Sequence, residues 1–347
     1  MMLAVNESVS YDDPMGKILV IGANSFSGAD FVDFLLSKTP HQVYGMDRVQ
    51  KTGLFLPYKQ QLKDAKKKKR WQFFKYDLNQ DMDKIAKTIL KMKPGYIINF
   101  AALSEVAPSW QHPDQWMETN VVALARLVNF LKDQKWLKKY TQISSPEAYG
   151  TTVGRIKEST PLNPSTPYAA SKAAADMLLF TYVKNFDFPL VVMRATNVYG
   201  AHQQLFKIIP RTAIYLKLGK KIELHGGGKA VKSYIHIRDV SRGYYAGLMK
   251  GKPGEIYHIS PDAGVAVRTV VEQMCRLAGK DFTQSAKVVA ERLGQDKAYT
   301  IDSSKARRAF SWKPTISLEQ GLKEVIDWVD KYWDEITQQP LEYIHQK

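Results

Sequence analysis

The stretch Lys17-Ile18-Leu19-Val20-Ile21-Gly22-Ala23-Asn24-Ser25-Phe26-Ser27-Gly28 decides the fold of this chain. A short apolar run of strand character leads into a glycine turn, and a helical apolar pattern follows the second glycine. Such a strand–turn–helix unit presents backbone N–H groups and a helix N-terminus to a pyrophosphate. Ser25 replaces the middle glycine usual in these loops, while the flanking glycines keep the tight turn. We therefore expect a dinucleotide site at Gly22, Asn24, Ser25, Phe26 and Gly28.

An acidic residue indicates which dinucleotide binds. The next predicted strand, 43–46, ends in Asp47, nineteen residues after Gly28. A carboxylate at this place accepts hydrogen bonds from the ribose hydroxyls and repels a 2′-phosphate, which favours NAD over NADP. The adjacent Arg48 could soften that preference.

The segment Tyr168-Ala169-Ala170-Ser171-Lys172 indicates the chemistry. It opens an apolar helical run, so residues four apart share a face and Lys172 lies beside the phenol. A neighbouring ammonium favours the phenolate and lowers the pKa of Tyr168, which would make it a proton acceptor for an alcohol. A strand upstream ends in Ser144-Ser145, whose hydroxyls could bond the same substrate oxygen.

Length and composition are consistent with an intracellular α/β enzyme. The 347 residues suffice for a large core and a smaller lobe, and the single Cys275 fits a reducing cytosol and excludes a disulfide framework. No apolar run approaches the ~18 residues needed to span a bilayer. The seven histidines show no metal-ligand spacing, so no metal is expected.

The net charge of +16 raises the question of a nucleic-acid partner. Lys66-Lys67-Lys68-Lys69-Arg70 is the obvious basic patch, and it falls where a loop is expected. No recognition helix, zinc pattern or aromatic platform accompanies it. A solvated loop is the preferred interpretation, and nucleic-acid binding is not expected.

Strands and helices alternate through the first two-thirds of the chain, which predicts a Rossmann-type doubly wound parallel sheet. We expect a loose tail over 1–16, an NAD-binding domain over 17–200, and a mainly substrate-binding lobe over 201–347 whose segments interleave with the first domain. The helices around 114–133 and 168–184 carry two apolar faces, so we predict that they pair across a homodimer; burial within one subunit is the alternative.

The order of motifs along the chain resembles the extended short-chain dehydrogenase/reductases, from about residue 17 to 335. Within that family the chain resembles the nucleotide-sugar 4,6-dehydratases. This resemblance rests on the segment Ser144-Ser145-Pro146-Glu147-Ala148-Tyr149-Gly150. Further motifs in family order are Asp77-Leu78, Ala101-Ala102, Thr119-Asn120-Val121, Asn197-Val198-Tyr199-Gly200 and Trp312-Lys313-Pro314.

The resemblance implies a hydro-lyase with tightly bound NAD. Tyr168 would take the proton of the sugar 4-hydroxyl as a hydride leaves carbon 4, with Lys172 and Ser145 supporting it. Glu147 would remove the proton of carbon 5, water would leave from carbon 6, and the hydride would return there. The dTDP-glucose branch has an aspartate acid where this chain has Pro146, so Glu147 alone or a water would protonate the leaving hydroxyl.

The resemblance also implies the binding residues. Asp77, Leu78, Ala101 and Ala102, with Tyr168 and Lys172, would contact NAD. The nucleotide-diphosphate sugar would meet Ser104, Asn197, Lys232 and Arg292.

Three alternatives stay open. A 4-epimerase usually has a small neutral residue where Glu147 stands. A UDP-glucuronate decarboxylase carries an arginine shortly before the catalytic tyrosine, and Pro164-Ser165-Thr166-Pro167 contains none. The third is a non-catalytic NAD- or nucleic-acid-binding protein that kept the fold.

Overall fold

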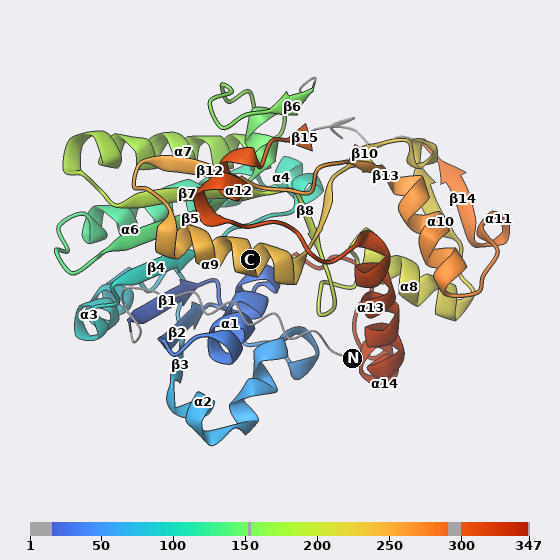
Figure 1. Ribbon diagram of the computed structural model, residues 1–347, viewed down its shortest axis with the longest axis horizontal. Coiled ribbons are helices and arrows are strands. Elements are labelled where there is room, and N and C mark those ends of the chain that lie inside the picture. The colour runs from blue at the N-terminus through green and yellow to red at the C-terminus, as the bar shows by residue number, and fades with distance from the viewer. Residues whose placement is uncertain (1–15, 152–153, 291–299, 346–347) are drawn as a thin grey trace.

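A computed structural model describes residues 16–151, 154–290 and 300–345 (Figure 1). Seven parallel strands form its main sheet in the order β12-β7-β5-β4-β1-β2-β3. The chain runs outward from β1 to β3 on one side and then crosses to β4 on the other. Ligands bind beyond the carboxyl ends of the strands at such a switch point. The strands are β1 (Lys17–Ile21), β2 (Gln42–Asp47), β3 (Trp71–Lys75), β4 (Tyr96–Asn99), β5 (Lys139–Ser144), β7 (Leu190–Ala195) and β12 (Glu255–Ile259).

Helices cover both faces of this sheet and bury a hydrophobic cluster on each. One face packs against α1 (Phe26–Lys38), α9 (Ile237–Lys250) and α12 (Ser304–Phe310). The other packs against α3 (Met82–Met92), α6 (Ala123–Leu131) and α7 (Pro167–Phe186). The predicted Rossmann-type doubly wound fold is therefore confirmed.

A third hydrophobic cluster lies to the side of the sheet, in what we call the C-terminal lobe (Figure 1). It consists of α8 (Ile208–Leu218), β9 (Ile222–His225), α10 (Val267–Leu277), α11 (Phe282–Ser285), β14 (Ala286–Val289), α13 (Leu318–Lys331) and α14 (Trp333–Thr337). Shorter elements are α2 (Ala65–Lys69), α4 (Val106–Gln111), α5 (Pro113–Met117), β6 (Arg155–Ile156), β8 (Asn197–Tyr199), β10 (Val231–Lys232), β11 (Tyr234–His236), β13 (Val265–Ala266) and β15 (Thr300–Ile301). None of the helices in the described ranges is long and apolar enough to cross a membrane.

The helix expected over 114–133 is present, and it contains a π-helical turn. A π-helical turn, η4 (Glu118–Val122), separates α5 from α6. The Asn120 side chain in this turn accepts from the Leu103 N–H (2.9 Å) and donates to the Ser171 hydroxyl (2.9 Å). It thereby ties the loop after β4 to α7. The spacing of apolar residues does not reveal such a turn, because a π-helical turn adds only a single residue to the helix.

The basic stretch 66–70 was expected to be a loop, and that expectation is wrong. Asp64 caps α2 by accepting from the Lys66 N–H (2.8 Å), and the lysines of this short helix are largely exposed. Arg70 instead donates to the carbonyl oxygens of Leu36 (2.8 Å) and Thr39 (2.9 Å) at the end of α1. One member of the apparent basic patch is therefore a helix-capping residue.

Candidate active site

A cavity of about 230 Å³ lies beyond the carboxyl ends of β1, β2 and β4, and we call it the cofactor pocket. Most residues predicted to contact NAD line it. They are Gly22, Asn24, Ser25, Asp47, Asp77, Leu78, Ala101 and Ala102. Ser104, predicted to bind the sugar nucleotide, also lines this pocket. Phe26 and Gly28 do not, because Phe26 packs against the core and Gly28 faces the glycine turn. Tyr168 and Lys172, also predicted to contact NAD, are not among the lining residues of this pocket either.

The glycine turn is shaped by close backbone contacts. Gly22 has φ +77°, and a Cβ there would lie 2.6 Å from the Ala101 nitrogen. A Cβ on Gly28 would lie 2.1 Å from the Gly22 carbonyl oxygen. Ser25 is the N-cap of α1, since its hydroxyl accepts from the Gly28 N–H (3.0 Å) and donates to the Gly22 carbonyl (2.7 Å). Serine thus fills the middle-glycine position as a helix cap.

Replacement of Gly28 by Ala should disrupt this pocket. The added methyl group would overlap the Gly22 carbonyl and move the turn, at a cost of about 1–3 kcal/mol. NAD affinity, measured by calorimetry, and the melting temperature should both fall. Gly53→Ala is the matched control, because its Cβ would find only Lys59 at 3.9 Å. Equal behaviour of the two variants would contradict the packing argument.

The chemistry of the pocket suits a dinucleotide with free ribose hydroxyls. The Asp47 carboxylate is held by the backbone N–H groups of Asn24 (2.9 Å) and Val49 (3.0 Å). Burial raises the pKa of Asp47, and the two backbone hydrogen bonds oppose that shift. Arg48 lies 3.8 Å from the Asp77 carboxylate. Gly22, Asn24 and Ser25 of the glycine turn line the same cavity as Asp47, so these residues fit NAD.

The four predicted catalytic residues lie in one region at the end of β5 and the start of α7. Ser145 accepts from the Glu147 N–H (3.2 Å) and is hydrogen-bonded to the Tyr168 side chain. Burial raises the pKa of Tyr168, the charge of Glu147 raises it further, and the Ser145 hydrogen bond opposes both. Glu147 therefore lies near enough to the phenol to influence its ionisation.

The expectation that Lys172 lowers the pKa of Tyr168 is wrong for the chain alone, because burial dominates. The Lys172 ammonium donates to the Ile143 carbonyl (2.8 Å) instead. Burial lowers the pKa of Lys172 to about 8, against the charge of Asp176. Lys172 is therefore a fixed cation at the base of the site.

Asp176 and Arg194 were missed by sequence analysis. They form an ion pair (2.6 Å) with both side chains 1% exposed, below Lys172. Asp176 also accepts from the Ser144 hydroxyl (2.5 Å), and the Arg194 guanidinium lies over the Tyr149 ring at 4.5 Å. The only signal was the spacing of Asp176, one turn after Lys172 on the same helix face.

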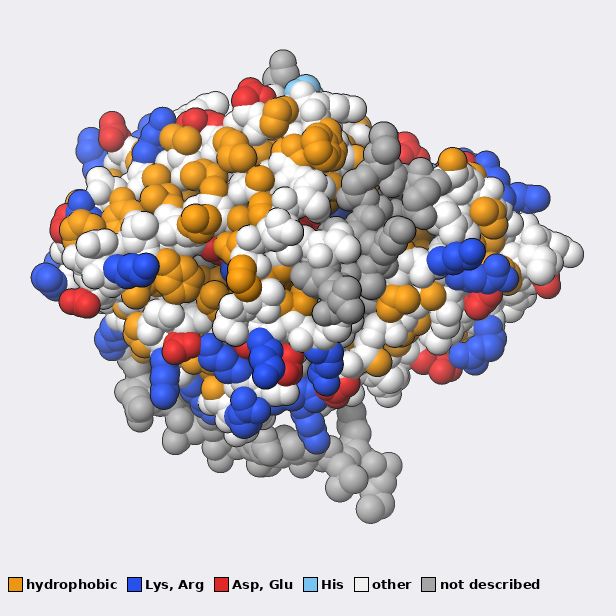
Figure 2. Space-filling model, turned by 90° about the horizontal axis from the view of Figure 1, so that it is seen from above, with side chains coloured by type: hydrophobic (Ala, Val, Ile, Leu, Met, Phe, Trp, Pro, Cys, Tyr) orange, Lys and Arg blue, Asp and Glu red, His pale blue; other side chains and the backbone are white. Residues whose placement is uncertain are grey.

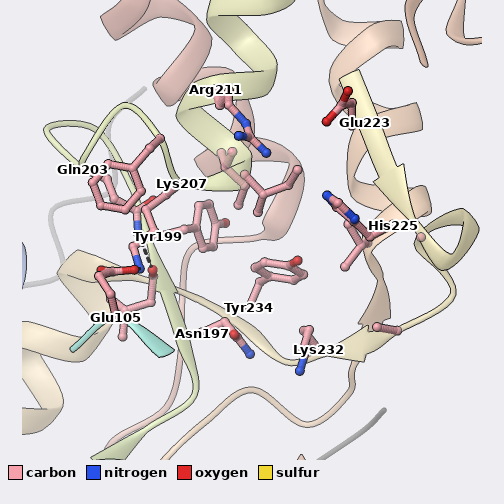
Figure 3. A pocket seen from close by; sticks show the side chains of 17 residues that line it. Glu105, Asn197, Tyr199, Gln203, Lys207, Arg211, Glu223, His225, Lys232 and Tyr234 are labelled. Atoms are coloured by element: carbon pink, nitrogen blue, oxygen red, sulfur yellow. Dashed lines mark hydrogen bonds and ion pairs between the residues drawn. The ribbon is translucent and has the colours of Figure 1, made fainter. Parts of the chain in front are cut away.

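A larger cavity of about 410 Å³ opens between the sheet and the C-terminal lobe, and we call it the nucleotide pocket (Figure 3). Of the residues predicted to bind the sugar nucleotide, Asn197 and Lys232 line it. Arg292 lies outside the described residues. Side chains that sequence analysis missed project from α8 and β9, notably Arg211 and Glu223 (Figure 3).

An ion pair joins the two sides of the nucleotide pocket near the catalytic residues. The Lys207 ammonium, at the start of α8, contacts the Glu105 carboxylate at 2.8 Å (Figure 3). The charge of Glu105 also raises the pKa of Tyr168.

The doubly wound sheet, the glycine turn and the paired tyrosine and lysine define an extended short-chain dehydrogenase/reductase. The chain belongs to the family described as GDP-mannose 4,6 dehydratase, whose sequence profile matches residues 19–325.

Known proteins with related chains are nucleotide-sugar enzymes. A dTDP-glucose 4,6-dehydratase from Haemophilus influenzae is 27% identical over 335 residues, covering 90% of this chain and 98% of that protein. The structure of the Bacillus anthracis dTDP-glucose 4,6-dehydratase in complex with NAD has a TM-score of 0.82 and 31% identity, covering 92% and 98%. A UDP-glucuronic acid 4-epimerase from Bacillus cereus in complex with UDP-glucuronic acid and NAD has a TM-score of 0.81 and 26% identity, covering 91% and 99%.

Proposed function

We propose that this protein is an NAD-dependent nucleotide-sugar 4,6-dehydratase, which converts a nucleoside-diphosphate hexose to its 4-keto-6-deoxy form. The observation that carries the proposal is the position of Glu147 on the turn after β5, where its N–H donates to the Ser145 hydroxyl (3.2 Å) that is hydrogen-bonded to the Tyr168 side chain. Epimerisation at carbon 4 needs only oxidation and reduction there, whereas elimination of water needs a base for carbon 5. The family and the dehydratase relatives support the same assignment.

Each side chain of the cluster has a distinct task in this proposal. NAD in the cofactor pocket would supply the acceptor and later the donor of a hydride. Tyr168 takes the proton of the 4-hydroxyl, and Ser145 donates a hydrogen bond to the developing charge on that oxygen. Lys172, whose ammonium is held by the Ile143 carbonyl at the base of the site, would contact NAD.

Glu147 removes the proton from carbon 5, and after the 6-hydroxyl has left as water it gives carbon 5 a proton taken up from solvent. Pro146, buried at the start of the turn that carries Glu147, has no proton to give to that hydroxyl. We propose that a water or Glu147 itself delivers it. At the other end of the substrate, Asn197 and Lys232 would hold the diphosphate, with Lys232 acting as a point charge.

A screen of the purified protein tests the function directly. dTDP-glucose, GDP-mannose, UDP-N-acetylglucosamine and UDP-glucuronate are supplied in deuterium oxide, and products are weighed by mass spectrometry. A dehydratase gives a product lighter by one water with a solvent deuteron at carbon 5. An unchanged mass would mean epimerisation, loss of carbon dioxide would mean decarboxylation, and no turnover would favour a binding protein.

We also propose that the chain works as a homodimer through the surface of α7 and the helices before it. Met177 is 65% exposed and Phe186 is 51% exposed on α7, and Trp110 is 57% exposed on α4. Figure 2 shows hydrophobic side chains gathered over the part of the molecule where α7 lies. An apolar surface of this kind favours a protein partner. A cytosolic location stays a prediction from the single cysteine.

Replacement of Met177 by Glu should give monomers in sedimentation velocity. The Met177 side chain is exposed in the isolated subunit, so its replacement removes no packing within that subunit. The melting temperature of the monomer should therefore not fall. Leu218→Glu is the control that introduces the same charge elsewhere, at a side chain of α8 in the C-terminal lobe that is 41% exposed. An unchanged sedimentation coefficient for Met177→Glu would reject this interface.

A further inference from the structure

The last residues of the chain leave the C-terminal lobe and return to the sheet domain. After α14 ends at Thr337, segment 338–345 reaches the corner between α4 and α5. There the His345 ring donates to or accepts from Gln115 Oε1 (2.7 Å) and stacks on His112 and Trp116, with ring centroids 4.8 and 5.6 Å away. This segment extends beyond the family match at residue 325.

Tyr343 is not a lining residue of either pocket, but it contacts Phe206 of the nucleotide pocket at the place where the nucleotide pocket and the cofactor pocket adjoin. At that point, residues that are close in sequence line different pockets. Ser104 and Gln204 line the cofactor pocket, and Glu105 and Phe206 line the nucleotide pocket. The Tyr343 ring packs edge-on against Phe206, with centroids 5.3 Å apart.

Residues of both pockets influence the ionisation of Tyr343. Burial raises its pKa, and the charge of Glu105 raises it further, while that of Arg48 opposes. Glu105 faces the nucleotide pocket and Arg48 the cofactor pocket. The Tyr343 hydroxyl is bonded to His345 Nδ1 (3.0 Å), so the anchor at His345 also fixes the tyrosine.

The hexose of a bound nucleotide sugar must occupy this junction. Its nucleotide lies in the nucleotide pocket, and its carbon 4 must reach both Tyr168 and the cofactor. The corner that anchors His345 adjoins the catalytic helix, because the Ser109 hydroxyl of α4 accepts from the Tyr168 N–H (3.1 Å). The anchored segment therefore sits beside the place where the sugar reacts.

We propose that Tyr343 is a binding residue for the hexose, carried into the active site by the C-terminal segment 340–345. The inference rests on the proposed function. The aromatic ring offers an apolar face to the sugar, and the segment helps to shield the reacting carbons from water. A bare nucleoside diphosphate, which has no hexose, gains nothing from Tyr343.

Equilibrium binding of dTDP-glucose and dTDP, compared by calorimetry on the NAD-loaded full chain, tests this inference. If the screen identifies a substrate other than dTDP-glucose, the same pair of measurements is made with that nucleotide sugar and its bare nucleoside diphosphate. Tyr343→Ala, His345→Ala and a chain ending at Gln339 should bind the nucleotide sugar about tenfold more weakly, the scale of one lost aromatic contact. Binding of the bare nucleoside diphosphate should not change. Ile344→Ala, whose side chain is 62% exposed, should behave like the native chain.

The outcomes separate this inference from the proposed function. Tyr343→Ala could weaken binding of the nucleotide sugar and of the bare nucleotide equally, or could leave both affinities unchanged. Either result would show that Tyr343 does not contact the hexose, and the inference would be overturned. Melting temperatures show whether the shortened chain is folded, and the two point variants carry the test if it is not. If the native chain binds the sugar more tightly than the nucleotide but yields no dehydrated product, the proposed function fails while the role of Tyr343 stands.

Discussion

Replacement of Glu147 by Gln should lower the rate of dehydration by about 10²–10⁴-fold, the usual contribution of a positioned acid or base. Glutamine keeps the size of the side chain but cannot accept the proton of carbon 5. Because the carboxylate also raises the pKa of Tyr168, its removal should not hinder proton transfer from the 4-hydroxyl. The loss should therefore fall on the elimination step.

Deuterium at carbon 5 of the recovered product or substrate is the measurement that isolates this step. With Glu147→Gln, solvent deuterium should enter carbon 5 as slowly as the product forms. Glu272→Gln, a half-exposed glutamate on α10 paired with Arg268, is the matched control and should be fully active. Rapid exchange at carbon 5 in Glu147→Gln would show that another group removes the proton.

Replacement of Asp176 by Asn should cost about 3–5 kcal/mol of stability, because it leaves the Arg194 guanidinium buried without a counter-charge. The same change should lower the pKa of Lys172 below its present value of about 8, since Asp176 is the charge that raises it. Less Lys172 would then be protonated at neutral pH. Activity should fall there and recover in part as the pH is lowered.

Unfolding in urea and a pH–activity profile check the two effects separately. Asp187→Asn, at the end of the same helix, is the control, because Asn adopts the left-handed conformation of that exposed residue as readily as Asp. A stable Asp176→Asn protein with an unchanged pH profile would mean that the ion pair neither supports the fold nor tunes the lysine.

Local sequence patterns were sufficient for the sheet and for most of the cofactor pocket. The glycine turn and Asp47 are close in sequence to the strands that position them, so spacing alone places them together. Ser25 was recognised as a departure, but its role as a cap depends on hydrogen bonds to Gly22 and Gly28 that only the folded turn shows.

The features that sequence analysis missed depend on contacts between distant segments. Arg194 pairs with Asp176 from another element, and Tyr343 meets Phe206 across more than a hundred residues. The sign of the Tyr168 pKa shift was wrong for a related reason. Proximity to Lys172 could be deduced from helix spacing, whereas the burial that outweighs it depends on the whole fold.

The position of β12 has a consequence for biosynthesis. This strand closes the sheet beside β7, yet it begins 60 residues after β7 ends. At about 5–20 residues per second, a nascent chain carries the unpaired edge of β7 for roughly 3–12 seconds before its partner has been made. An open strand edge invites pairing with other chains. Protection of that edge during translation, for example by a chaperone, should therefore raise the yield of folded protein.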